Sequence, residues 1–421
     1  MNVLWIVNKR CGALHQKLHG KKSTGGLWLD AMLDEAYGTD DNIVVVNIEK
    51  KPALKYLRDN NISYYTLQGE PNHKYDYKSK VNIQAFKQII EKEKIDVLQI
   101  WGTEFPYALA AFEAAPDLPS VVYIQGVLDS IAKYYLASLS AKELKEAVTL
   151  RDLLTNSTIK STQKQYEKRS LYEKQIICRS GHIIVENLWA QAYYKKINTD
   201  VAVHFCPITI SSTFFEKTWD STKTQSHSIM CSAANYPIKG LHMLLKALSI
   251  VKNTYPDVRL YIPGTVLKNT STLKNRIKQN GYDRLITKMI DKLNLSDNII
   301  YTGRLTAEEM ADKMSSVSCF VMSSAIENHS STLKEAMAVG TPCVASYVGG
   351  VPEYVRNEEN ALLYRYEDYE MLAYNIIRLF ADSELAKRLS SCAKSQMSMP
   401  KEESDYTKIK NILEKVTQKQ Q

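Results

Sequence analysis

At 421 residues the chain is too long for one ordinary hydrophobic core, so we expect two or three domains. Apolar residues make up 44% and charged residues 24%, which indicates a globular protein and excludes a disordered or membrane-spanning one. The formal charge of +8 favours acidic partners, but the chain has no DNA- or RNA-binding motif, and we expect no nucleic acid partner.

The first half of the chain alternates short apolar runs with amphipathic segments. We predict helices near 51–60 and at 81–93, and strands at 3–7, 43–48, 62–67, 95–101 and 121–124. Alternation at this spacing predicts a right-handed doubly wound sheet. The loops at 102–106 and 125–126 follow neighbouring strands, so we expect both at the same edge of that sheet.

Gly25 and Gly26 stand where the first strand leads into a helix. Glycine lets backbone N–H groups come close to a ligand oxygen. Taken alone, however, the pair is better explained as a flexible turn. The G-x-G-x-x-G pattern is absent, so a dinucleotide site is not supported.

Residues 133–196 are helical in pattern and rich in lysine, arginine and tyrosine. One interpretation is a surface for anionic lipid, or for the diphosphate of a lipid-linked acceptor. The other, which we favour, is a solvated helix face whose charge is partly balanced by glutamates. Strands at 182–186 and 201–205 then end the first domain, and 207–215 is expected to be a linker.

The second half opens with a strand near 227–232 and a helix from Gly240. Lys239 stands just ahead of this helix, where a positive charge beside free N–H groups could hold a diphosphate. Further strands are predicted at 258–264 and 298–303. Arg304 follows the second of them and could add a charge, although an ordinary salt bridge explains it equally well.

The strand predicted at 317–322 leads into the most informative stretch. Ser330 or Ser331 can cap a helix that begins near Thr332, and Gly340 can end it. Glu327 and Glu335 flank the loop and the helix start, at the carboxyl end of a parallel strand, where α/β proteins bind ligands. A carboxylate can accept hydrogen bonds from a vicinal diol, and a helix N-terminus attracts a diphosphate.

The string Glu-x7-Glu-Ala-Met-Ala-x-Gly-Thr-Pro, from Glu327 to Pro342, resembles the E-x7-E motif of the family 4 retaining glycosyltransferases, part of glycosyl transferases group 1. The resemblance implies the GT-B fold: an α/β architecture of two doubly wound, Rossmann-like domains facing a cleft. It implies an N-terminal acceptor-side domain at 1–206 and a C-terminal nucleotide-sugar donor domain at 207–398. The terminal helix at 399–421 is expected to cross back to the first domain.

The resemblance also implies residue roles. Glu335 would bind the ribose, Glu327 would orient the donor sugar without acting as a covalent nucleophile, and Lys239 would offset phosphate charge; we expect the last two to be catalytic. Other donor-binding positions are expected at Gly25, Gly26, Asn235, Arg304, His329, Ser330, Ser331 and Thr332, and acceptor-side positions at Gly102, Glu104 and Gln125. The chain departs from the family at Ala234, where arginine is usual, and at Gln125, where histidine is common.

The implied activity is retaining transfer of a sugar from a nucleotide-diphosphate sugar to a hydroxyl of a glycan or lipid-linked acceptor, in cell-surface polysaccharide synthesis. No metal or other cofactor is expected, because members of the resembling family need none and the sequence has no Asp-x-Asp to hold one. Lys239 and backbone N–H groups would offset the phosphate charge instead. Two alternatives stay open. A GT-B-like sugar-nucleotide epimerase would consume donor without acceptor, and a non-catalytic binding module would bind the nucleotide sugar without releasing nucleotide.

The seven cysteines form no C-x-x-C pair and stand mostly in apolar runs, so we expect reduced thiols and a cytoplasmic location. No histidine has a partner at zinc-ligand spacing. The apolar run at 1–8 is too short for a signal peptide, and no apolar stretch has the length of a membrane span. Any contact with an anionic membrane is therefore expected to be peripheral, at its inner face.

Overall fold

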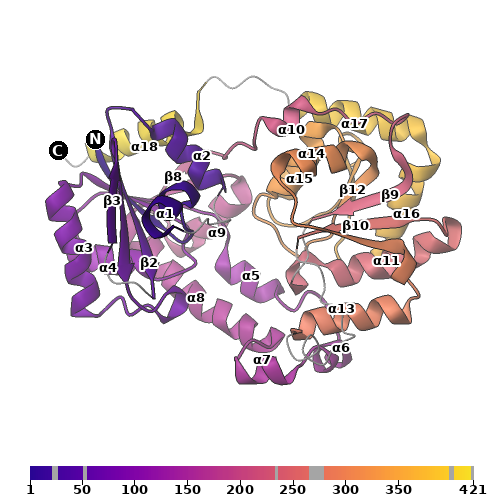
Figure 1. The fold of residues 1–421 in the computed structure, drawn as a ribbon, viewed down its shortest axis with the longest axis horizontal. Helices are drawn as coiled ribbons and strands as arrows, with labels where there is room; N and C mark the ends of the chain where they lie inside the picture. The colour runs from indigo at the N-terminus through magenta and orange to yellow at the C-terminus, as the bar shows by residue number, and fades with distance from the viewer. Residues whose placement is uncertain (21–26, 51–54, 233–235, 265–278, 398–402, 419–421) are drawn as a thin grey trace. The chain divides into compact units, whose positions relative to one another are not determined.

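The computed structural model describes the chain except for residues 21–26, 51–54, 233–235, 265–278, 398–402 and 419–421 (Figure 1). The chain divides into two units. Unit 1 comprises Met1–Asp129, Tyr166–Thr209 and Lys401–Gln421, and unit 2 comprises Ser130–Gln165 and Ile210–Pro400. Among the described residues, no helix combines the length and the apolar character needed to cross a bilayer.

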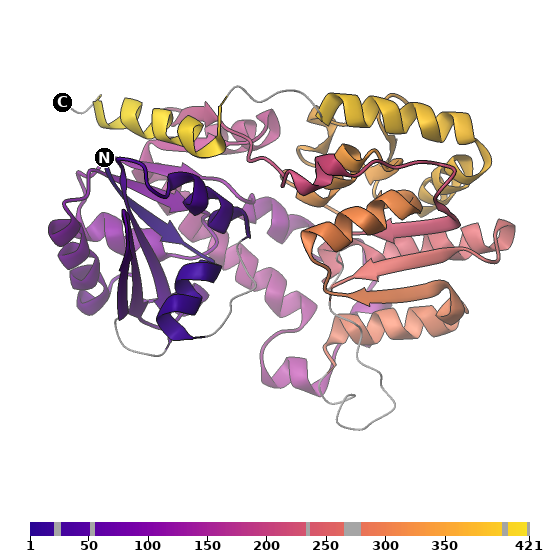
Figure 2. The ribbon, with the colours of Figure 1, turned by 45° about the horizontal axis from the view of Figure 1, so that its top comes forward.

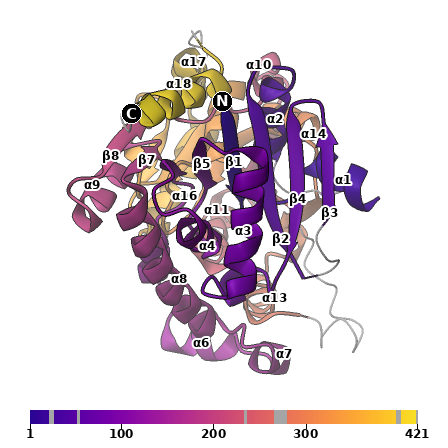
Figure 3. The same ribbon diagram turned by 90° about the vertical axis from the view of Figure 1, so that its left-hand side faces the viewer.

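Unit 1 is built on an eight-stranded sheet with the order β3-β4-β2-β1-β5-β6-β7-β8 (Figure 3). Every neighbouring pair is parallel except β3 and β4. The strands are β1 (Asn2–Val7), β2 (Asn42–Glu49), β3 (Lys55–Asp59), β4 (Ile62–Gln68), β5 (Val97–Trp101), β6 (Ser120–Tyr123), β7 (His182–Val185) and β8 (Ala202–Phe205). The doubly wound sheet predicted for the first half is confirmed.

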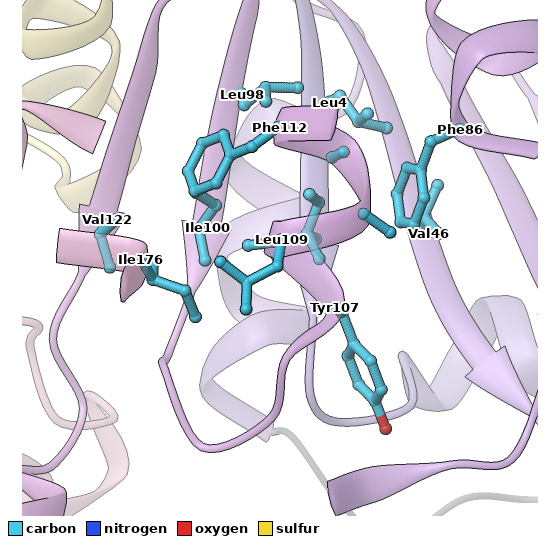
Figure 4. Close-up of a cluster of buried hydrophobic side chains, with 14 of the residues drawn as sticks. Leu4, Val46, Phe86, Leu98, Ile100, Tyr107, Leu109, Phe112, Val122 and Ile176 are labelled. Atoms are coloured by element: carbon cyan, nitrogen blue, oxygen red, sulfur yellow. The ribbon is translucent and has the colours of Figure 1, made fainter. Parts of the chain in front are cut away.

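The sheet of unit 1 is buried on both faces, because successive strand residues point to opposite sides. In β1, Leu4 and Ile6 pack beneath helices α3 (Lys80–Glu93) and α4 (Tyr107–Ala114), as Figure 4 shows in part. Val3, Trp5 and Val7 pack on the other face. The helices on that face are α1 (Gly12–His19), α2 (Leu27–Ala36) and α18 (Asp405–Gln418).

The helix predicted near 51–60 is wrong over the part that the structure describes. Lys55–Asp59 is the edge strand β3, joined to β4 by a two-residue loop whose first residue, Asn60, has φ 55°. Asparagine tolerates this left-handed conformation, which tight hairpin loops require. Tyr56 lies opposite Tyr65 across the two strands, with ring centroids 4.7 Å apart.

Unit 2 contains a six-stranded, fully parallel sheet with the order β11-β10-β9-β12-β13-β14, part of which is visible in Figure 2. Its strands are β9 (Gln225–Cys231), β10 (Arg259–Pro263), β11 (Ile299–Gly303), β12 (Val317–Met322), β13 (Cys343–Ser346) and β14 (Leu362–Tyr364). Two groups of helices pack on it. One group is α11 (Leu241–Thr254), α13 (Gly281–Lys292) and α16 (Tyr369–Ala381), and the other is α14 (Ala307–Ser316), α15 (Ser331–Val339) and α17 (Ser383–Met397).

Each sheet has one point where its strand order reverses. In unit 1 the chain continues from β1 to β2 on one side and later adds β5 on the other. In unit 2 it continues from β9 to β10 and later adds β12 on the opposite side of β9. Ligands of open α/β sheets bind outside the carboxyl ends of the strands at such points. The loops that follow β1 and β5, and those that follow β9 and β12, are therefore the candidate sites.

Unit 2 also contains a segment from the first half of the chain. Ser130–Gln165 was expected in the domain at 1–206, but it carries α6 (Ala141–Glu146) and α7 (Leu150–Leu154) and packs on α11 and α13. Nζ of Lys246 on α11 lies 3.1 Å from Oε1 of Glu143 on α6. Nε2 of the buried His242 donates to the Ala137 carbonyl at 2.7 Å, with the Tyr282 hydroxyl on its other nitrogen. These contacts depend on tertiary docking and leave no periodic signal in the sequence.

Gly281→Ala should destabilise unit 2, although alanine ordinarily favours a helix over glycine. Gly281 is the first residue of α13, and a Cβ there would overlap the carbonyl oxygen of Ala147 at the end of α6. We expect the free energy of unfolding to fall by about 1–3 kcal/mol, as in other overpacked sites. Thermal unfolding measures this, with the exposed Lys292→Ala on the same helix as control. Unchanged or increased stability in Gly281→Ala would contradict this packing.

Candidate functional site

Two loops meet at the strand-order reversal of unit 2. The first carries Lys239 at the end of the 3-10 turn Pro237–Lys239, and the second begins with Ser323 directly after β12. Ser323 Oγ donates to the Lys239 carbonyl at 3.0 Å, and Ala325 N donates to the Ile238 carbonyl at 2.7 Å. Gly240 has φ 70°, and a Cβ there would overlap the Ser323 carbonyl oxygen. Only glycine allows the two loops to approach this closely.

Lys239 and Glu327 form an ion pair between these loops. Nζ of Lys239 lies 2.5 Å from Oε1 of Glu327, and Ser324 Oγ donates to the same oxygen at 2.6 Å. The side chains are 23% and 12% exposed. Burial alone would lower the pKa of Lys239, but the Glu327 carboxylate raises it above its ordinary value, so the ammonium stays charged. The pair thus places a fixed cation at the sheet edge.

The Glu327 loop is also fixed from its other side. Gly350 N donates to the Glu327 carbonyl at 3.2 Å. The neighbouring Gly349 has φ 52°, and a Cβ on it would overlap the same carbonyl oxygen. The glycine pair after β13 therefore has a packing reason, because it lets one backbone lie against the other.

Glu335 lies on α15, half-buried, and differs from Glu327 in having no partner. No hydrogen bond or ion pair to its carboxylate occurs within the part of the chain that the structure describes. Burial raises the pKa of Glu335 from 4.5 to about 7. A half-buried carboxylate without a partner is a suitable acceptor for ligand hydroxyl groups.

The start of α15 brings together the other four predicted positions of this loop. Ser330 caps the helix by accepting from Leu333 N at 3.4 Å, so its hydroxyl is engaged within the helix. His329 Nδ1 lies 3.0 Å from Lys334 Nζ, and its ring lies 4.9 Å from that of Tyr354. Ser331 is exposed and Thr332 half-buried in the first turn. The first-turn N–H groups of a helix favour anions.

Of the remaining predicted donor positions, only Arg304 lies in the described part of the chain, and it is not gathered at this place. Arg304 is exposed and follows β11, the edge strand, so β10 separates its strand from β9. Gly25, Gly26, Asn235 and the departure at Ala234 lie outside the described residues. Ser324, which sequence reasoning missed, contacts Glu327 directly. Its position in the polar turn after a parallel strand was a usable signal.

The predicted acceptor-side residues lie at the carboxyl edge of the unit 1 sheet. Glu104 accepts a hydrogen bond from the Asn8 amide, and Gly102 (φ 90°) leaves room for this contact. Burial raises the pKa of Glu104 despite that hydrogen bond. Gln125 follows β6, the neighbour of β5, so all three predicted positions share one sheet edge.

Sequence reasoning missed a second buried carboxylate near this edge. Glu173 accepts from the hydroxyl groups of Thr103 at 2.8 Å and Tyr194 at 2.7 Å. Burial raises its pKa to about 7, and the nearby charge of Glu104 adds to that shift. Glu173 lies in the middle of the basic helix α8 (Ile159–Ser180), where its pattern is that of an ordinary charge-balancing residue.

Known proteins resemble the chain in sequence and in structure. Residues 214–396 match the family described as glycosyl transferases group 1. A mannosylfructose-phosphate synthase of Agrobacterium fabrum is 27% identical over 155 residues, which is 36% of this chain and 32% of the relative. A D-inositol 3-phosphate glycosyltransferase of Streptomyces bingchenggensis is 32% identical over 148 residues, or 33% of this chain and 32% of the relative. The chain thus spans about a third of the length of these curated relatives.

Solved structures match the whole length. Sucrose-phosphate synthase from Thermosynechococcus elongatus superposes with a TM-score of 0.72 at 17% identity, covering 100% of both chains. Anabaena Alr3699/HepE in complex with UDP-glucose gives 0.64 at 14% identity, covering 99% of this chain and 100% of the other. At such identities the likeness shows the fold. The chain therefore has the two-domain GT-B fold, and its residues 214–396, which carry Lys239, Glu327 and Glu335, match the glycosyl transferases group 1 family.

Proposed function

We propose that the protein is a retaining glycosyltransferase. It moves a sugar from a nucleotide-diphosphate sugar to a hydroxyl of a glycan or lipid-linked acceptor, in cell-surface polysaccharide synthesis. One observation carries the proposal: a charged Lys239, its partner Glu327 and the unpartnered Glu335 lie in the two loops and the helix at the strand-order reversal of a glycosyl transferases group 1 domain.

The donor site follows from the chemistry of these groups. Glu335 accepts hydrogen bonds from the ribose hydroxyls, and the start of α15 receives the diphosphate. Lys239 adds a positive charge where negative charge grows on the leaving diphosphate, a stabilisation that is worth more in the transition state than in the ground state. Alr3699/HepE, which shares the fold, was solved with UDP-glucose, and this supports a nucleotide sugar as the donor.

Glu327 serves as an orienting residue in this proposal. Its Oε1 already accepts from Lys239 and Ser324, and these hydrogen bonds lower the nucleophilicity of a carboxylate. Retention then arises when the acceptor hydroxyl attacks from the face that the diphosphate leaves. The new glycosidic bond forms as the anomeric C–O bond to the diphosphate breaks, and the acceptor proton passes to a diphosphate oxygen.

A coupled assay tests the proposal. The purified protein is incubated with UDP-, GDP- and ADP-sugars, with and without extracted glycans or lipid-linked acceptors, in the presence and absence of EDTA. We expect nucleotide release that needs acceptor and survives EDTA, and NMR of the product should show the anomeric configuration of the donor. Inversion would refute retention. Conversion of donor alone to an epimer, or binding without turnover, would replace the proposed function by an epimerase or a binding module.

Contact with an anionic membrane is part of the same proposal. Helix α8 carries Lys160, Lys164 and Lys168, for which no ion pair is found among the described residues. Cationic helix faces are attracted to anionic lipid within about one Debye length, roughly 8 Å at physiological salt. Such contact would bring the protein to a lipid-linked acceptor at the inner face of the membrane.

The affinity for a nucleotide sugar should increase as the pH rises through 7. Because burial raises the pKa of Glu335 to about 7, the free carboxyl holds a proton below that pH and loses an acceptor site for ribose. We expect the dissociation constant to fall about fivefold to tenfold between pH 6 and pH 8. Calorimetry with UDP-glucose, whose diphosphate does not titrate in this range, measures it. Glu335→Gln should flatten the profile, and an equal slope in both proteins would exclude Glu335 as the cause.

The same shift predicts how stability depends on pH. In the unfolded chain Glu335 loses its proton near its ordinary pKa of 4.5, whereas the folded chain holds the proton up to about 7. Between these values the folded state binds more protons, so this group makes the free energy of unfolding fall as the pH rises through that window. Glu335→Gln should remove this part of the decline in thermal unfolding curves.

A further inference from the structure

Arg169 on α8 is held between two aromatic rings in unit 1. Its guanidinium carbon lies 4.8 Å from the centre of the Tyr166 ring and 5.2 Å from that of Phe105. Its Nε is buried and has no hydrogen-bond partner within the described ranges. An arginine whose planar group is fixed by stacking and whose donors are not all used is well suited to binding an oxyanion.

A row of aromatic contacts connects Arg169 to a second basic segment. The Phe105 ring lies 5.6 Å from that of Tyr107, and the Tyr107 hydroxyl accepts a hydrogen bond from Asn72 N at 2.6 Å. Figure 4 shows this hydroxyl turned away from the apolar cluster. Asn72 begins the 3-10 turn Asn72–Lys74, so the row positions His73 and Lys74 at the same end of unit 1.

The pKa of His73 shows that several positive charges lie around its imidazole ring. Burial lowers the pKa of its imidazole, and the positive charges of Arg169, Lys74 and Lys168 lower it further. Its Nδ1 is buried and has no hydrogen-bond partner among the described residues, as is the case for Arg169 Nε. A buried nitrogen atom without a partner costs free energy unless a ligand or a water pairs with it, and these two lie beside the charges of Lys74 and Lys168.

The four residues His73, Lys74, Lys168 and Arg169, called the basic cluster below, lie beside the predicted acceptor edge. The positive charge of Arg169 partly opposes the rise that burial causes in the pKa of Glu104, so the two side chains are near each other, and Glu104 follows β5 at the strand-order reversal of unit 1. A solvated helix face would leave these charges in water. Arg169 and His73 are instead half-buried, and each has one nitrogen atom with no hydrogen-bond partner among the described residues, which favours a bound ligand.

We propose that His73, Lys74, Lys168 and Arg169 bind a phosphoryl group on the acceptor. The inference rests on the proposed function, because it names the chemical class of the molecule that receives the sugar. The guanidinium fork and the imidazole donate to phosphoryl oxygens, and the two lysines offset the charge. A sugar phosphate and the phosphoryl group of a lipid carrier present the same chemistry.

Calorimetry with inorganic phosphate, in the absence of any donor, tests the site in the full chain. Arg169→Gln should weaken phosphate binding about 10- to 100-fold, the usual range for a charged hydrogen-bonded contact. Arg169→Lys keeps the charge but lacks the planar guanidinium, so its phosphate affinity should lie between those of the wild type and Arg169→Gln. Arg179→Gln is the matched control, since Arg179 lies on the same helix and is 2.6 Å from Glu113. Equal phosphate affinity in Arg169→Gln and wild type would overturn the site.

A third variant separates this site from the donor site. Lys239→Met should leave phosphate binding in unit 1 intact. If instead Lys239→Met no longer binds phosphate while Arg169→Gln binds it fully, the phosphate lies at the donor site and the proposal is refuted. The assay uses no donor. Phosphate binding without sugar transfer would therefore refute the proposed function alone, and transfer without phosphate binding would refute the basic cluster alone.

Two further arms identify the source of the phosphoryl group. One compares glucose 6-phosphate with glucose, and the other compares vesicles with and without undecaprenyl phosphate. The wild type should bind the phosphorylated probe of at least one pair more tightly than its unphosphorylated counterpart. If Arg169→Gln loses that preference, the site is supported, and the pair in which the preference is lost identifies the source of the phosphoryl group. Equal losses in Arg169→Gln and Arg179→Gln would show a general surface charge effect and overturn it.

Discussion

Glu327→Ala and Lys239→Met should each lower the turnover number by about 100- to 1000-fold, the range seen when one group that stabilises developing charge is removed. Lys239 would lose its charge at the leaving diphosphate, and Glu327 would no longer hold either the donor sugar or the ammonium. Steady-state kinetics at saturating donor measures the effect, and thermal unfolding shows how much of the chain stays folded. Wild-type turnover in both folded variants would refute these roles.

The chain offers a matched control for this pair. Lys246 and Glu143 form an ion pair of similar burial in the same unit, with N and O 3.1 Å apart and side chains 28% and 21% exposed. Lys246→Met should change turnover by less than about fivefold, because a partly exposed pair away from the reacting atoms contributes only modestly. A loss as large as that of Lys239→Met would show that instability, and not lost chemistry, explains both results.

The double variant separates catalysis from folding. Removing one partner leaves a half-buried charge without its counter-ion, which is destabilising. Glu327→Gln combined with Lys239→Met removes both charges and should unfold at a higher temperature than Lys239→Met alone. Its turnover should stay low. Recovery of stability without recovery of activity would assign the two effects to different causes.

The sheets and the donor loop could be predicted from the sequence for a physical reason. A parallel strand that is buried on both faces has a nearly continuous run of apolar residues, as at 43–48 and 317–322. Both runs are strands in the structure. The helix after Glu327 is bounded by a capping serine and a left-handed glycine at Gly340, and these local signals also hold. Local signals of this kind can be predicted from the sequence because they depend on residues that lie only a few positions apart.

Features that depend on distant contacts could not be predicted in this way. The Lys239–Glu327 ion pair joins residues 88 apart and requires β12 to lie beside β9, which no local pattern states. The helix predicted near 51–60 is wrong because Lys55–Asp59 is an edge strand with few apolar residues, whose side chains alternate in exposure. So short and polar a segment carries little local pattern that separates a strand from a helix. The docking of 130–165 on α11 and α13 is likewise set by tertiary contacts such as that of His242.

Gly240→Ala should be among the most destabilising single substitutions in unit 2 and should also lower turnover. Alanine at φ 70° costs about 1–2 kcal/mol in backbone strain, and its Cβ would overlap the Ser323 carbonyl oxygen. Because Ser323 and Lys239 are joined by a 3.0 Å hydrogen bond, relief of this overlap must move the loop that carries the ammonium. A displacement of about 1 Å in a catalytic group can lower turnover about 100-fold.

Gly303→Ala isolates the backbone strain from the overlap. Gly303 has φ 75° in the same unit, and no described atom lies within 4 Å of the place that a Cβ would take there. The free energies of unfolding of the two variants should therefore differ by about 2 kcal/mol or more, the scale of overpacking in a well-packed site. Gly303→Ala should keep near wild-type turnover. Equal losses of stability and of activity in both would mean that the approach of the two loops, and with it the placement of Lys239, does not depend on Gly240.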